Sequence, residues 1–287
     1  MTRTDGRPHR AQRLAWITAT LLCAVLVVAP ATWQVWSWGS TRSDTLHGGS
    51  DGRPVTAVEI VGGDADITVT PRADRQVDYR ATVSWSLRTP TIERSRLGDT
   101  LRLTPHCPGE GFWPVGGTGC SVQLAVTVPV DVPVKVTTRS GRIALSGLAG
   151  TVDAEVDSGQ VEIVGLRGAL RAKVGSGRLE ATGLASDQAE IRVGSGRAAA
   201  TFVSPPDGIT ARVGSGRLAL TVPAATRFTV RCEAGAGRCD VPDALRDPTS
   251  PRSLDIEAGV GRAEASYPDG PWSPPPPPAG DTATPDT

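Results

Sequence analysis

Apolar and polar residues alternate in short segments between Val55 and Tyr267, and glycine-centred corners separate these segments. A period of two is typical of β-strands that bury one face. We therefore predict that small aliphatic side chains on both sides of each corner point into a narrow core. The clearest inward positions before corners are Val152, Ala154, Val156, Leu170, Ala172, Val174, Ala189, Ile191 and Val193, and those after corners are Ile143, Leu145, Val161, Ile163, Leu179, Ala181, Leu218 and Leu220.

The corners are copies of one unit, Lys173-Val-Gly-Ser-Gly-Arg178, which recurs at Arg192–Arg197 and Arg212–Arg217. Looser copies extend the series in both directions, so that its second glycines are Gly141, Gly159, Gly177, Gly196, Gly216, Gly237 and Gly261. A fixed corner recurring between alternating segments indicates a repeat architecture in which each coil stacks on the next. The predicted fold is all-β, a single-chain parallel β-helix (β-solenoid) with about 18–21 residues per coil, preceded by one transmembrane helix.

The predicted β-solenoid domain spans residues 55–267, and within it residues 77–128 break the period. A stack of strands must cover its first open end, so we expect 77–128 to form an irregular cap. Residues 39–54 are rich in Gly, Ser and Asp and are predicted to be a flexible linker. Residues 268–287 are rich in proline and are predicted to be a disordered tail.

The N-terminus has the features of a membrane anchor. Residues 1–13 hold four arginines and one acid, and no charged residue occurs from Leu14 to Val35. At about 1.5 Å per residue, such a helix would cross a hydrocarbon core of about 30 Å. We therefore predict a transmembrane anchor over 14–38, with residues 1–13 in the cytoplasm and a single-pass protein whose solenoid lies outside. The alternative is a cleaved signal peptide, with Ala29-Pro-Ala31 as the site, and a secreted protein.

Four of the five cysteines form two close pairs, Cys107 with Cys120 and Cys232 with Cys239. Two local disulfides in an oxidising compartment are the predicted arrangement, and two pairs of free thiols are the alternative. No C-x-x-C motif is present, so we expect neither a metal nor another cofactor.

Charge and residue usage argue against two functional classes. Thirty basic and thirty acidic residues give a net charge of zero, whereas a nucleic-acid binder normally has a basic excess. Residues 129–267 contain no histidine and no G-x-S-x-G motif, and the corner serines are repeated rather than unique. We therefore predict a protein that is not an enzyme. The alternative, a polysaccharide-acting solenoid enzyme, would need a cluster of acids or a metal on one face.

The basic residues of the corners form the candidate site. Equivalent residues of stacked strands lie about 4.8 Å apart, so Arg178, Arg197 and Arg217 would form one column. A second column would contain Lys173, Arg192 and Arg212. All six cations would border one groove and could bind an anion. The alternative is a solvated face that nearby acids such as Glu180 and Glu190 neutralise.

With Val-Gly-Ser-Gly-Arg corners at this spacing behind an N-terminal anchor, the chain resembles a bacterial β-solenoid family of adhesin-like domains whose function is otherwise unknown. The resemblance covers residues 55–267 and is strongest over 134–222. It implies adhesion and brings no catalytic residues. We therefore expect a non-catalytic extracytoplasmic module for adhesion, interaction or cell-envelope scaffolding. Its expected partners are the membrane, through the N-terminal helix, and a cell-wall polymer or an envelope protein, without nucleic acid.

Overall fold

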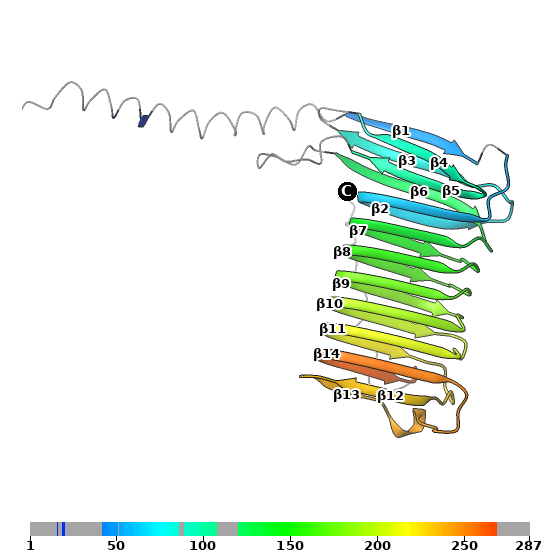
Figure 1. The fold of residues 1–287 in the computed structure, drawn as a ribbon, viewed down its shortest axis with the longest axis vertical. Helices are drawn as coiled ribbons and strands as arrows, with labels where there is room; N and C mark the ends of the chain where they lie inside the picture. Colours follow the sequence, from blue (N-terminus) through cyan, green and yellow to red (C-terminus); the bar gives the residue numbers. More distant parts are fainter. Residues whose placement is uncertain are drawn as a thin grey trace, which may run out of the picture.

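The computed structural model describes residues 16, 19, 20, 42–50, 52–85, 89–107 and 120–268. Its strands form one 14-stranded sheet, which Figure 1 shows as a stack running from β1 at one end to β12 and β13 at the other. The elements are β1 (Arg42–Gly49), β2 (Ala57–Arg72), β3 (Asp78–Trp85), β4 (Thr91–Leu97), β5 (Thr100–His106), β6 (Ser121–Pro129), β7 (Val134–Ser146), β8 (Val152–Val164), β9 (Leu170–Leu184), β10 (Gln188–Phe202), β11 (Gly208–Thr221), β12 (Thr229–Ala234), β13 (Arg238–Asp240), the 3-10 helix η1 (Asp243–Leu245) and β14 (Ser253–Ser266).

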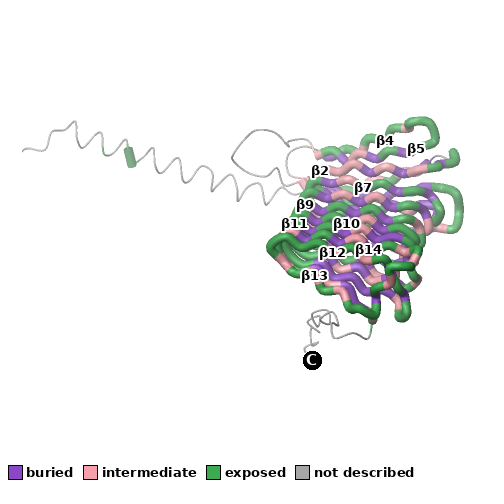
Figure 2. Tube along the Cα trace, turned by 60° about the horizontal axis from the view of Figure 1, so that its bottom comes forward, coloured by how far each residue is buried: buried purple, intermediate pink, exposed green. Residues whose placement is uncertain are grey.

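The middle of the stack consists of parallel strands in matching register. Strands β7 to β11 pair in chain order, and each Val-Gly-Ser-Gly-Arg unit lies directly against the next. In β9 the last buried residue before the corner is Val174 and the first after it is Leu179, with four exposed residues between them. Val174 and Leu179 are an odd number of residues apart, which would place their side chains on opposite faces of a straight strand. Both are buried, so the chain must turn at the corner. Figure 2 shows the resulting alternation of buried and exposed positions along the stacked strands.

The second glycine of each corner is required by the stacking. Gly196 has φ 132°, a conformation that residues with a side chain rarely adopt. A Cβ atom there would overlap the carbonyl oxygen of Gly177 in the preceding strand. Because every corner is packed on the one before it, the repeat retains glycine at this position.

The prediction that the fold is all-β is confirmed, and every inward position named from the sequence is buried. The sheet, however, is mixed rather than purely parallel. Strand β3 is antiparallel to β1 and β6, and β4 is antiparallel to β5. Strands β5 and β6 are both parallel to β2 and extend the stack beyond it.

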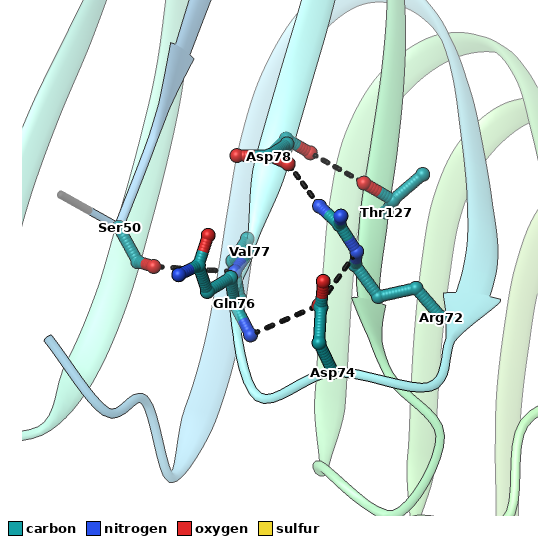
Figure 3. A network of polar contacts seen from close by, with 7 residues as sticks. All are labelled: Ser50, Arg72, Asp74, Gln76, Val77, Asp78 and Thr127. Atoms are coloured by element: carbon teal, nitrogen blue, oxygen red, sulfur yellow. Dashed lines mark hydrogen bonds and ion pairs between the residues drawn. The ribbon is translucent and has the colours of Figure 1, made fainter. Parts of the chain in front are cut away.

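Residues 39–54, expected to be a flexible linker, instead contain strand β1, which pairs along its whole length with β3. A polar network fixes the connection between β2 and β3, next to the end of β1 (Figure 3). Arg72 contacts both Asp74 and Asp78, and the Ser50 hydroxyl accepts a hydrogen bond from the Val77 amide at 3.2 Å. These tertiary contacts order a segment whose composition alone is typical of a linker.

The last strands do not follow chain order. Strand β14 pairs with β11, and the shorter β12 and β13 pair with the outer edge of β14. The order of corners is therefore Gly216, Gly261, Gly237, which differs from the order in the sequence. The reason is that β14 fits the core of the stack better than β12 does. Strand β14 buries Leu254, Ile256 and Ala258, which continue the row of inward aliphatic side chains, whereas β12 buries no residue fully.

Among the described residues, no helix is long and apolar enough to cross a membrane. This finding contradicts the predicted single-pass location, and the location is corrected accordingly: no membrane span is assigned within the described residues. An uncharged run of sufficient length meets one requirement of a span without establishing one. Residues 1–13, most of 14–38 and the tail from 269 to 287 lie outside the described residues.

Candidate functional site

Five arginines lie side by side at the corners of the stack. The strand register places Arg197 against Arg178 and against Arg217, and then Arg217 against Arg262. Arg262 in turn lies against Arg238 of β13. We call these five residues the corner arginines. All of them are exposed, because the corner turns each side chain away from the core.

The corner arginines line a groove of about 1140 Å³ that runs across the strands. Its floor consists of the corner glycines, and its remaining lining residues are Gln160, Ala236 and Val260. None of the residues that line this groove is an acid or a histidine. The groove is therefore strongly basic, and the exposed backbone of Gly177, Gly196 and Gly216 lies between the arginines.

The corner arginines have few acidic partners. In the part of the chain that the structure describes, Arg178, Arg197 and Arg217 make no ion pair, and Arg262 has only a distant one, 3.9 Å from Asp240. The residue two positions after Arg197 is an alanine, and so is the residue two positions after Arg217. In the strand register, these two alanines lie between Glu180 on one side and Glu264 on the other. The positive charge is thus least compensated in the middle of the groove.

The second predicted column has a different environment. Lys173, Arg192 and Arg212 are also adjacent in register, but they lie before the corner and do not line the groove. Lys173 pairs with Glu155 and Arg192 with Glu190, and Arg212 Nε lies 3.0 Å from a carboxylate oxygen of Glu257.

The acids near this second column also raise the pKa values of basic side chains beside them. A hydrogen bond to Glu155, strengthened by the charge of that carboxylate, raises the pKa of Lys173 above its ordinary value. Arg171 is held in the same way, because the hydrogen bond and charge of Glu190 raise its pKa. The prediction that six cations border one groove is therefore corrected: three of them line it, and the other three belong to a face that acids neutralise.

Two members of the site, Arg238 and Arg262, were not included in the predicted columns. Each occupies the last position of a degenerate corner copy, Glu233–Arg238 or Glu257–Arg262. Their shared arginine was a usable signal. The exchanged order of β14 and β12, which brings Arg262 next to Arg217, could not be read from the repeat itself.

The groove ends at the side of β7. The position equivalent to Arg178 in β8 is Gln160, and the Arg142 guanidinium donates to its amide oxygen at 2.9 Å. The backbone amide of Arg142 donates to Asp66, and Ser140 contacts Asp64. The corner of β7 is thus tied to polar and acidic groups, and the uncompensated charge begins only at Arg178.

The structure contains two disulfides, Cys107–Cys120 and Cys232–Cys239. The first joins the end of β5 to the beginning of β6. The second joins β12 to β13 across the outermost corner, next to Arg238. In the described ranges, no group of three or more His, Cys, Asp or Glu side chains could hold a metal ion.

No family model matches the chain, and no curated protein matches it in sequence. Several solved structures are similar to it. A "putative cell adhesion protein" from Clostridium sporogenes is 13% identical, with 79% of this chain and 99% of that chain covered and a TM-score of 0.37. A "putative adhesin" from Bacteroides fragilis is 16% identical over 77% and 97% of the two chains, with a TM-score of 0.35. A "putative lipid binding protein" from Parabacteroides distasonis is 12% identical over 79% and 97%, with a TM-score of 0.38. At these TM-scores, no function is inferred from the similarity.

Proposed function

We propose that this protein is a non-enzymatic interaction module that binds an anionic polymer in the groove lined by the corner arginines. The observation that carries the proposal is the adjacency of five exposed arginines in a groove without a carboxylate. Like charges held side by side repel one another, so an anion in the groove relieves a cost that the free protein bears.

A scaffold of this kind suits a binding surface better than a catalytic site. Hydrolysis of a glycan needs paired carboxylates that protonate the leaving group and activate a nucleophile or water. The residues that line the groove include glycine, arginine, glutamine, alanine and valine, none of which can supply that pair. The alternative of a polysaccharide-acting enzyme therefore has no support from this groove.

The proposal extends to the architecture and the compartment. The parallel strands from β7 to β11, with β14, are the repeating coils of a β-solenoid, and the mixed strands before them close one end. Two disulfides are typical of proteins that fold in an oxidising compartment. The polymer would accordingly belong to the cell envelope or its surroundings, where polyanions such as teichoic acids occur.

Binding to an anionic polymer tests the proposal, with a matched pair of double variants. Arg197→Gln with Arg217→Gln removes two charges from the groove, and Arg192→Gln with Arg212→Gln removes two from the same strands outside it. Retention of the full chain on immobilised polygalacturonate or teichoic acid is measured from about 50 to about 500 mM salt, a range in which the Debye length shortens severalfold. We expect the groove variant to elute at markedly lower salt, and the control to elute near the wild type. Equal elution of the two variants, or no retention of the wild type on either polymer, would refute the proposal.

A further inference from the structure

The spacing of the corner arginines limits which polyanion can use all of them. Each arginine lies directly opposite the next in the register, without a shift between strands. Neighbouring strands are about 4.8 Å apart, so the five arginines span roughly 19 Å along the stack. A ligand that contacts all five must therefore lie across the strands and present a negative charge about every 5 Å.

The two ends of the row fix its length. On one side the row stops at Gln160, which accepts hydrogen bonds from Arg142 at 3.3 and 2.9 Å. On the other side Arg238 belongs to β13, which pairs with β14 on the outer side of the stack. The row thus offers five consecutive cationic positions, and a longer ligand gains no further arginine from it.

The spacing of the row favours carboxylates on sugar units. A guanidinium group presents a planar fork that matches a carboxylate or a phosphate in two parallel hydrogen bonds, so the fork alone does not choose between them. A hexuronate unit advances a glycan chain by roughly 4.5–5 Å, close to the spacing of about 4.8 Å between strands. By comparison, a strand of B-form DNA carries one phosphate per roughly 3.4 Å of helix axis and winds around that axis, so its phosphates do not follow a straight row of arginines.

The surface between the arginines also suits a sugar ring. The corner glycines line the groove, and Gly177, Gly196 and Gly216 are exposed, so a flat ring lying there would meet backbone. Val260 of β14 lies directly opposite Ser215 of β11 in the register. Its side chain is 56% exposed and lines the groove. An exposed aliphatic side chain beside a row of cations can pack against the C–H face of a pyranose while its carboxylate pairs with an arginine. The long arginine side chains can reach carboxylates on either edge of such a chain.

We infer that the groove binds a linear polyuronate, a glycan with one carboxylate on each sugar, that lies along the stack with about one sugar per strand. This inference rests on the proposed function and specifies its ligand. It differs from general attraction to polyanions in one measurable respect, which is that affinity has a length limit of about five sugars.

The experiment measures the dissociation constants of oligogalacturonates from dimer to octamer for the full chain, by calorimetry at one low salt concentration. An exposed ion pair contributes a modest amount, so we expect affinity to rise about threefold with each added sugar up to the pentamer. From pentamer to octamer the change should stay within about twofold, since no arginine is added. Arg217→Gln should weaken pentamer binding about threefold to tenfold and Arg212→Gln should leave it within about twofold, because only Arg217 lines the groove.

The outcomes separate this inference from the proposed function. If affinity rises steadily to the octamer, or is already constant at the trimer, the match between sugars and strands is wrong. Tighter binding of a thymidine oligonucleotide or of oligoglutamate than of the galacturonate pentamer at equal charge would also overturn the ligand class. In both cases, salt-dependent polymer binding that requires Arg197 and Arg217 would still support the proposed function. If no polyanion binds, both proposals fail.

Discussion

The substitution Gly196→Ala tests whether close stacking of the corners determines the repeat. Gly196 combines two constraints, a positive φ of 132° and an approach to Gly177 that leaves no room for a Cβ atom. Two other glycines have one constraint each. Gly98, at the turn between β4 and β5, has only the backbone constraint: its φ is 63°, and nothing lies within 4 Å of the place that a Cβ atom would occupy. Gly194 has only the steric constraint: its φ is not positive, but a Cβ atom would lie 2.5 Å from the carbonyl oxygen of Gly175.

The magnitudes follow from these geometries. A side chain forced into the left-handed region costs about 1–2 kcal/mol, which is the whole expected effect at Gly98. Displacing a packed backbone to admit a methyl group costs about 1–3 kcal/mol, which is the expected effect at Gly194. Gly196→Ala incurs both, so we expect a loss of about 2–5 kcal/mol in the free energy of unfolding. With an m-value of about 2 kcal/mol/M, its urea midpoint would fall by about 1–2.5 M.

The assay is equilibrium unfolding of the full chain in urea, followed by far-UV circular dichroism with the disulfides intact. The three alanine variants are compared with the wild type under identical conditions, and equal m-values are required for the comparison. We expect Gly196→Ala to lower the midpoint most. If it lowers the midpoint no more than Gly98→Ala does, the stacked corners have room for a side chain and the steric argument is refuted.

Two further predictions concern the core and the end of the stack. Ile191→Asp buries an unpaired charge at a position with 0% exposure and should unfold the domain. The Arg197→Asp variant, which changes an exposed corner residue, should fold normally. If the two variants have similar circular dichroism spectra and urea midpoints, the assignment of inward and outward positions is wrong. Replacing Cys232 and Cys239 by serine should lower the free energy of unfolding by about 2.5 kcal/mol in the chain-entropy model for a closed loop of this length. This loss is measured under non-reducing conditions, and an unchanged midpoint would show that the bond does not constrain the end of the stack.

The sequence by itself determined the repeating part of this protein. Alternation fixed which side chains point inward, because a strand exposes and buries residues with a period of two. The glycine corners fixed where the chain turns, and the alignment of each corner with the next fixed the register of strands β7 to β11. These properties are local, or they recur with each copy of the unit, so each copy reports the same information.

Only the tertiary structure decided the two ends and the composition of the groove. Residues 42–49 became a strand because β3 offers a partner along their whole length. Strand β14 displaced β12 from its expected place because its aliphatic residues continue the core, and this exchange brought Arg262 beside Arg217. The corner likewise separated Arg197 from Arg192: among the described residues Arg197 makes no ion pair, whereas Arg192 lies beside Glu190. Pairing between distant segments and the direction of a side chain at a turn depend on which surfaces meet, and a repeat pattern alone does not contain that information.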